Sequence, residues 1–148
     1  MTMSSGPIRA GEAPLVAWRT GVQTRLHVTP SVRPTSLCVI EQWSEPGAGA
    51  PPHSHANAEE LIVVIEGSAE FQLEDDRAEV ASGDSVLLPA GGRHSFRNSG
   101  DGVLHTLAVF DTARPLVEYE EQPGTVLEIA GESSELLDPH RARVDAPS

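Results

Sequence analysis

The 148-residue sequence contains no lysine, and its ten basic residues are all arginine. A mechanism that depends on a lysine Schiff base, as in enzymes that hold pyridoxal phosphate, is therefore excluded. Cys38 is the only cysteine, so neither an intrachain disulfide nor a thiolate-rich metal site can form. Because Cys38 lies in the apolar run Leu37-Cys38-Val39-Ile40, a buried hydrophobic residue is a simpler interpretation than a nucleophile.

Positive charge is scarce as well, with a formal net charge of −12 at pH 7. This charge argues against nucleic acid and against an anionic membrane surface, since both attract clustered Lys and Arg. The N-terminal segment MTMSSGPIRAGEAPL has no continuous apolar core, so we do not expect a signal peptide, and no apolar run approaches a membrane span. These features predict a cytoplasmic protein that acts on small molecules.

Aromatic residues make up 4% of the chain and apolar residues 39%, which is low for a compact protein of this size. Part of the length is therefore expected to lie outside the core. We predict a flexible N-terminal arm over residues 1–14, one β domain over 15–113, a C-terminal extension over 114–130 and a disordered acidic tail over 131–148.

Between residues 15 and 110, short apolar runs alternate with Gly, Pro, Asn and Asp, which predicts an all-β sandwich or barrel. Residues 69–73 alternate between apolar and polar, as in a half-buried strand. Residues 61–65 are apolar on both faces, so a second sheet or a partner subunit should cover each side. The candidate strands are 37–43, 60–65, 69–73, 78–80, 85–88, 94–97 and 103–110.

Histidines and one glutamate form a pattern with metal-ligand spacing. On a strand, the pair His53-Ser54-His55 places both imidazoles on one face, where they can converge on one ion. Glu60 follows after a short turn-like segment, and His94 begins a later strand after the loop 89–93. Three imidazoles and one carboxylate suit a first-row divalent ion.

The residues around these positions are more specific than the histidine spacing alone. Gly47 to Gly67 reads G-x5-H-x-H-x4-E-x6-G, and Gly83 to Asn98 reads G-x5-P-x-G-x2-H-x3-N. These segments resemble the two signature motifs of the cupin superfamily, and the 15 residues between them match the short spacer of small microbial cupins. The resemblance implies a small single-domain cupin, with motifs over 47–67 and 83–98 of a jelly-roll barrel, also called a double-stranded β-helix.

The resemblance also implies that His53, His55, Glu60 and His94 hold one divalent transition-metal ion (Fe, Mn, Zn, Ni, Co or Cu). Glu59 is the rival carboxylate, because the family allows either spacing. We prefer Glu60 because it lies seven residues before Gly67, as the motif requires.

Strand parity suggests further residues near this centre. Phe96 should face inward with His94, and Phe71 belongs to the apolar face of its strand, so both are candidate pocket walls as well as candidate core residues. One of Gln42 and Trp43 should face the cavity. His105 can serve as a general acid or base if it faces inward, or as a hydrogen-bonded strand residue if it faces outward.

The family hosts many activities on one scaffold, so the resemblance is compatible with two functions. The first is a metal-dependent enzyme acting on a small organic molecule, of the isomerase, cyclase, lyase or dioxygenase type; small cupins with an intact ligand set include cyclases of aromatic polyketides. The alternative is a non-catalytic barrel that binds a small molecule or supports a partner. The resemblance also implies a homodimer, with the segment 15–28 as a candidate exchanged strand.

Overall fold

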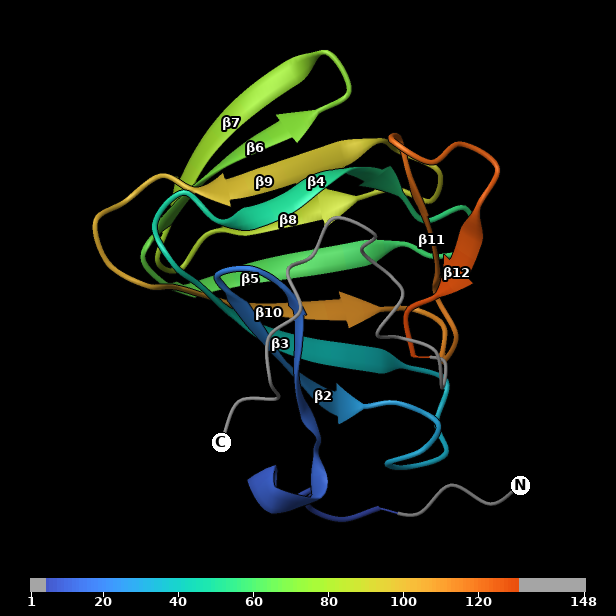
Figure 1. The fold of residues 1–148 in the computed structure, drawn as a ribbon. Coiled ribbons are helices and arrows are strands. Elements are labelled where there is room, and N and C mark those ends of the chain that lie inside the picture. The colour runs from blue at the N-terminus through green and yellow to red at the C-terminus, as the bar shows by residue number, and fades with distance from the viewer. Residues whose placement is uncertain (1–4, 131–148) are drawn as a thin grey trace.

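The computed structural model describes residues 5–130, which form two six-stranded antiparallel sheets (Figure 1). A 3-10 helix, Ala10–Glu12, precedes the first strand. Sheet A has the strand order β1-β2-β3-β10-β5-β8 and sheet B the order β12-β11-β4-β9-β6-β7. The strands are β1 (Leu15–Arg19), β2 (Val22–Val28), β3 (Cys38–Ser44), β4 (Gly49–Ser54), β5 (Glu60–Glu66), β6 (Ser68–Leu73), β7 (Asp76–Ala81), β8 (Ser85–Leu88), β9 (His94–Asn98), β10 (Leu104–Phe110), β11 (Leu116–Tyr119) and β12 (Val126–Glu128).

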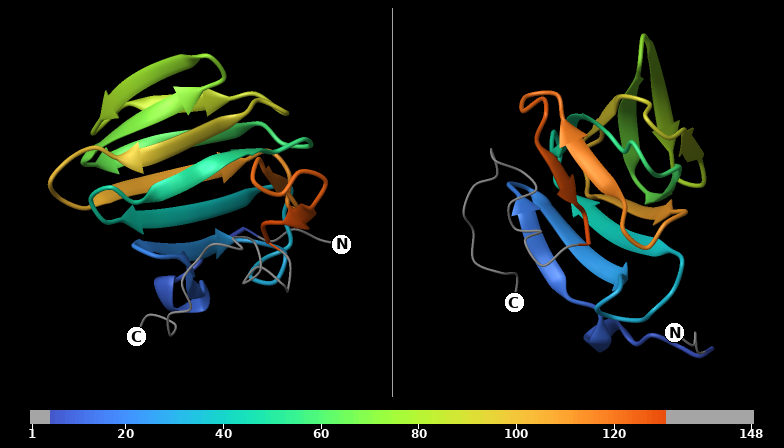
Figure 2. Two further views of the ribbon diagram at one scale, coloured as in Figure 1. Left: turned by 45° about the horizontal axis from the view of Figure 1, so that its top comes forward. Right: turned by 90° about the vertical axis from the view of Figure 1, so that its right-hand side faces the viewer.

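The two sheets pack face to face as a jelly roll, as the two further views in Figure 2 show. The alternating burial of β10 illustrates how the strands fill the space between the sheets. Leu104, Thr106, Ala108 and Phe110 are buried, and the residues between them are only half-buried. The all-β, jelly-roll prediction is confirmed. In the described part of the chain, no helix is both long and apolar enough to cross a bilayer.

Each predicted strand is present, with bounds that differ by two residues or fewer. Five strands outside the predicted set complete the sheets: β1, β2, β4, β11 and β12. β4 contains Pro51 and Pro52, which cannot donate to a ladder, and the register between β4 and β9 is interrupted between Ala50 and His53. The segment 15–28 forms β1 and β2 of this chain's own sheet A, paired antiparallel.

Both ends of the described chain make more contacts with the two sheets than the sequence predicts. Arg25 donates to the carbonyl oxygens of Ala10 and Ala13, which ties part of the expected N-terminal arm to sheet A. The C-terminal extension supplies β11 and β12, which join sheet B beside β4. The expected acidic tail, residues 131–148, lies outside the described residues.

The glycines and the asparagine of the two motifs have structural roles in turns. Gly67, Gly83 and Gly91 have φ values of 94°, 93° and 80°, in the left-handed region that favours glycine. Asn98 is buried and holds the turn after β9: its amide donates to the carbonyl oxygens of Ser44 and Gly102, and its oxygen accepts from the Gly100 amide.

We expect Asn98→Ala to lower the free energy of unfolding by about 3 kcal/mol, because it leaves buried backbone groups without partners. Asn57→Ala is the matched control, since Asn57 also bonds twice to backbone, at Arg114 and Leu116, but is exposed. Its cost should stay below about 1 kcal/mol. Urea unfolding measures both, and equal costs would contradict the structural role assigned to Asn98.

Candidate metal centre

Three histidines from two separate parts of the chain meet inside the barrel. His53 lies near the end of β4, His55 directly after it, and His94 begins β9. All three are buried, and one potential ligand atom from each lies within 4.8 Å of the others. The His53 and His94 ring centroids are 4.2 Å apart. The paired register of His53 and His94 across β4 and β9 places the two rings side by side.

Each ring is oriented by the backbone through its Nδ1 atom. Nδ1 of His53 lies 2.6 Å from the carbonyl oxygen of Pro51, Nδ1 of His55 2.7 Å from that of Leu116, and Nδ1 of His94 3.1 Å from that of Gly92. A carbonyl oxygen only accepts, so Nδ1 must carry the proton in each ring. In the neutral form of each imidazole the lone pair therefore lies on Nε2, the atom available to a metal.

Glu60 completes the cluster from the first position of β5. Its Oε1 atom lies 3.3 Å from Nε2 of His55 and 3.3 Å from Nε2 of His94. Burial alone would raise the pKa of this carboxyl, but the interactions with His55 and His94 outweigh it and lower the pKa to about 2. Glu60 is therefore ionised at neutral pH. Glu59, the rival carboxylate, is exposed.

The pKa of His53 is held well below its usual range, first by burial and then by the neighbouring His94 and His55 rings. A neutral His53 is thus the stable form at neutral pH. An uncharged imidazole beside an ionised carboxylate is the combination that coordinates divalent transition metals without first losing protons.

Within the described residues, Nε2 of His55, Nε2 of His94 and Oε1 of Glu60 are buried without a hydrogen-bond partner, and Oε1 lies 3.3 Å from each of the two nitrogens. Buried polar atoms without partners are costly and rare. The three buried histidines can form a metal site, and the adjacent carboxylate fits the same ion. The donor set suits several first-row metals and does not select one.

The cluster opens into a small cavity between the sheets, with a volume of about 50 Å³. Apolar side chains form most of its wall. The polar groups on the wall other than the cluster itself are contributed by Gln42, Thr106, Trp18, Arg19 and Tyr119. Arg19 donates to the Tyr119 hydroxyl at 2.8 Å and to the carbonyl oxygen of Gly49 at 3.0 Å, which connects β1 to both β11 and β4.

Of the predicted pocket residues, two line the cavity and one belongs to the hydrophobic core. Gln42 and Phe96 line the cavity. Phe71 does not: it is fully buried in the core and stacks on Phe96, with ring centroids 5.2 Å apart. Phe71 is a supporting core residue, because it faces inward but lies one strand further from the histidines, on β6 beside β9.

His105 lies outside the cavity, so its suggested role as a general acid or base at this centre is wrong. It projects from the opposite face of β10 to Thr106, which lines the cavity. There its Nε2 contacts Glu41, which also contacts His27, and its ring stacks on Trp43 with centroids 4.9 Å apart. His105 is therefore a hydrogen-bonded strand residue, the second of the two alternatives.

Several cavity residues were not found from the sequence. Trp18 and Arg19 come from β1, Thr106 from β10 and Tyr119 from β11. The Leu116 carbonyl that orients His55 also lies on β11. No motif marks these positions, and those on β1 and β11 depend on how the two ends of the chain add strands to the sheets.

Cys38 is fully buried, and its pKa is raised to about 12, first by burial and then by the charge of Glu60. At pH 8, about one thiol in ten thousand would be ionised. We expect a thiol-specific reagent to label native protein at least about 1,000-fold more slowly than urea-unfolded protein. Rapid labelling of the folded chain would contradict the buried placement; the unfolded protein is the control for reagent activity.

Comparison with known proteins agrees with the fold. Residues 43–110 match the family model described as the cupin domain. This match includes all four clustered side chains and both motifs. The chain therefore contains a small cupin-superfamily domain.

Individual relatives share this part of the chain. Protein SchB of Streptomyces halstedii is 38% identical over 84 residues, 56% of this chain and 61% of that protein. Polyketide synthase CurC of Streptomyces cyaneus is 34% identical over 84 residues, 56% of this chain and 54% of that protein. The matches span about half to two thirds of the length of these relatives.

Among solved structures, the polyketide cyclase RemF from Streptomyces resistomycificus superposes with a TM-score of 0.64. The superposition covers 85% of this chain and 86% of that chain at 19% identity. At this identity, the likeness supports the shared fold alone.

Proposed function

We propose that the chain is a metal-dependent enzyme that acts on a small organic molecule. In this proposal His53, His55, His94 and Glu60 hold one divalent transition-metal ion. The observation that carries it is the set of three buried atoms without hydrogen-bond partners, Nε2 of His55, Nε2 of His94 and Oε1 of Glu60, at the wall of a cavity.

A divalent ion bound there would supply a Lewis acid or a redox centre to the substrate. The protein's own groups prepare the site. The carbonyl oxygens of Pro51, Leu116 and Gly92 accept from Nδ1 of the three rings, which leaves Nε2 of each ring for the metal. Glu60 brings a negative charge that offsets part of the charge of the ion.

Substrate binding would fall to the polar groups on the cavity wall. Gln42 and Thr106 approach from β3 and β10 and offer an amide and a hydroxyl group to substrate oxygens. Part of the Gln42 amide is already engaged, since it donates to Thr24 at 2.9 Å. The apolar remainder of the wall excludes water and strengthens these interactions.

The volume of the cavity limits the substrate. Pockets for drug-sized ligands have roughly 300–1,000 Å³, whereas this cavity has about 50 Å³. A substrate of a few non-hydrogen atoms fits it directly. Cyclisation or isomerisation of a larger molecule, which the relation to polyketide proteins favours, would require Val117 and Tyr119 on β11 to move away from the cavity.

The test uses protein stripped with a chelator and reloaded separately with Mn²⁺, Fe²⁺, Zn²⁺ or Ni²⁺. Each form is incubated with small enolisable ketones and carboxylic acids, and with aromatic polyketide precursors, while NMR follows products and an electrode follows oxygen. We expect product from at least one metal form and none from stripped protein or from His53→Ala/His94→Ala.

The small cavity also favours a second candidate, a barrel that binds a small molecule without converting it. In that case, small molecules would shift NMR signals of cavity residues in the metal-loaded protein, while no substrate in the panel would be consumed. This result would overturn the enzyme proposal and leave a binding module.

A further inference from the structure

His55 and Glu60 are placed by the short segment 55–60, which we call the ligand segment. Residues 55–59 contain a turn and no strand, so the ladders of the two sheets do not hold them. The amide of Gly91 donates to the His55 carbonyl oxygen at 2.9 Å, which fixes the backbone there but not the orientation of the ring. The orientation of the ring therefore depends on contacts from elsewhere in the chain.

Residues 111–116, which lead from β10 into β11, supply these contacts. The carboxylate of Asp111 accepts from the Glu59 amide at 3.0 Å, and the Asp111 amide donates to the Glu59 carbonyl oxygen at 3.3 Å. At the other end, the Leu116 carbonyl oxygen lies 2.7 Å from Nδ1 of His55. Residues 111–116 thus contact the ligand segment next to both of its cluster residues.

Asn57 joins the middle of the ligand segment to the start of β11. Its side-chain oxygen accepts from the Leu116 amide at 2.8 Å, and its side-chain amide donates to the Arg114 carbonyl oxygen at 3.1 Å. The peptide groups of Leu116 are therefore both engaged with the ligand segment, the N–H with Asn57 and the carbonyl with His55. A side chain that fixes the position of Leu116 also fixes the acceptor that orients the His55 ring.

The sheet ladder does not hold Leu116 against the barrel. Within residues 5–130, β11 pairs with β4 at two positions, Glu118 and Tyr119. Leu116 instead pairs with β12, the edge strand of sheet B. An edge hairpin with so few ladder pairs has low local stability, so the Asn57 side chain anchors the end of β11 that lies beside His55.

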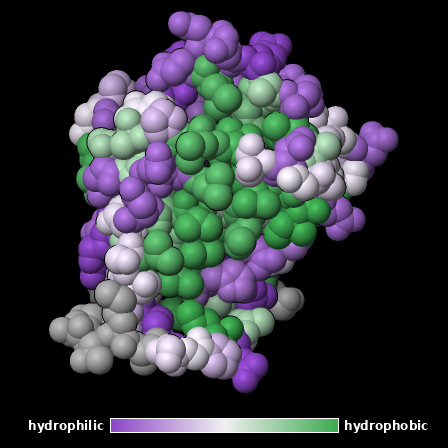
Figure 3. All heavy atoms as spheres, turned by 180° about the vertical axis from the view of Figure 1, so that it is seen from behind, coloured by the Kyte–Doolittle hydropathy of each residue, from purple (hydrophilic) through white to green (hydrophobic). Residues whose placement is uncertain are grey.

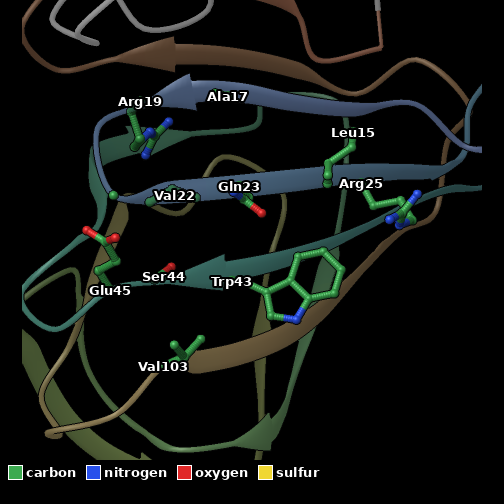
Figure 4. A pocket seen from close by; sticks show the side chains of 11 residues that line it. Leu15, Ala17, Arg19, Val22, Gln23, Arg25, Trp43, Ser44, Glu45 and Val103 are labelled. Carbon is green, nitrogen blue, oxygen red and sulfur yellow. The ribbon is translucent and has the colours of Figure 1, made fainter. Parts of the chain in front are cut away.

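The outer face of sheet A supplies apolar surface rather than polar support. Figure 3 shows a broad apolar area on the side of the molecule seen from behind. Leu61, Ile65 and Leu87, on β5 and β8, are large exposed apolar residues of this sheet. Over β1, β2 and β3 lies a hollow of about 530 Å³ (Figure 4), and among the described residues Arg19 alone lines both this hollow and the metal cavity. The contacts that hold the ligand segment thus lie elsewhere, at residues 111–116.

We propose that Asn57 is a positioning residue of the metal centre. It holds Leu116 in the place where the Leu116 carbonyl accepts from Nδ1 of His55 and so directs Nε2 toward the ion. This inference rests on the proposed function, because it requires that the clustered side chains hold a metal. Groups that orient a metal-binding imidazole typically contribute 10- to 100-fold to metal affinity. Asn57 acts through Leu116, so the effect of its loss should lie near the lower end of that range.

The first step of the inference is measured without metal, by NMR hydrogen exchange of the stripped protein. The Leu116 amide should exchange with solvent at least about 10-fold faster in Asn57→Ala than in the wild type, because its acceptor is removed. An unchanged exchange rate would overturn the inference.

The second step is measured by titration of the stripped proteins with Zn²⁺ against a competing chelator. Asn57→Ala should raise the dissociation constant for Zn²⁺ about 10-fold. Asn57→Asp keeps an oxygen that accepts from the Leu116 amide, so its dissociation constant should stay within about threefold of the wild-type value. If Asn57→Asp lost as much affinity as Asn57→Ala, the contact with Leu116 would not be the cause and the inference would fall.

Asp84→Ala is the matched control, since Asp84 is also exposed and accepts from the Ala81 amide in the turn between β7 and β8. Urea unfolding of the stripped proteins should show similarly small stability losses for Asn57→Ala and Asp84→Ala, while Asp84→Ala binds Zn²⁺ as the wild type does. Equal Zn²⁺ affinities of the wild type and Asn57→Ala would overturn this inference and leave the proposed metal site standing. A wild type that binds neither Zn²⁺ nor Mn²⁺ would overturn both.

Discussion

Simultaneous replacement of His53 and His94 by alanine should reduce bound metal from about one ion per chain to nearly none. The substitution removes two of the three imidazoles that converge in the cavity and leaves His55 and Glu60, too few donors for a closed site. Changes to residues that only orient ligands typically cost 10- to 100-fold in affinity, so we expect a loss greater than about 100-fold. Elemental analysis and calorimetric titration with Zn²⁺ or Mn²⁺ measure it.

His105→Ala is the control for this experiment. His105 is a histidine on the same barrel, but it lies on the outer face of β10, in contact with Glu41. The metal content of this variant should equal that of the wild type. If the double variant kept its metal, or His105→Ala lost it, the assignment of the metal site to His53, His55, His94 and Glu60 would be wrong.

Phe71→Ala should lower the free energy of unfolding by about 3–5 kcal/mol, because it removes a fully buried ring and leaves a cavity against Phe96. For a chain of this size, the melting temperature should fall by roughly 10–20 °C. Thermal and urea unfolding of the metal-free protein give both values and keep metal binding out of the comparison.

Phe71→Leu keeps most of the buried volume and should cost less than half as much. At a temperature where both variants are folded, each should bind metal as the wild type does, since Phe71 does not line the cavity. A small stability loss combined with weakened metal binding would contradict the core role and restore Phe71 as a wall of the site.

The candidate site was largely predictable because its residues lie in two short motifs with fixed spacing. The spacing selected Glu60 over Glu59, and the structure buries Glu60 beside His55 and His94 while Glu59 is exposed. Strand parity also placed Phe96 on the inner side of β9. The fold class followed from short apolar runs and turn residues, which are local signals.

The side of β10 on which His105 lies was not predictable. Parity identifies the inward face only when one face is polar, but both faces of this strand are rich in apolar residues. The outward row contains Leu107 and Val109, which are apolar and half-buried. These two residues removed the signal that would have placed His105 correctly.

Strand parity also could not distinguish residues that line the cavity from residues that lie in the hydrophobic core. Phe71 and Phe96 both face inward, and only their distance from His94 along and across the sheet distinguishes them. β4 and β11 escaped prediction for other reasons. Pro51 and Pro52 argue against a strand, and the four residues of β11 give too short a pattern to recognise, although their backbone orients His55.

We propose that this cupin domain holds one transition-metal ion on His53, His55, His94 and Glu60. This claim is tested most directly by elemental analysis of the protein purified without chelator and without a metal-binding tag. We predict about one divalent transition-metal ion per chain, removable by chelation and restored on reloading. A folded protein that holds no transition metal, even after reloading, would contradict the claim.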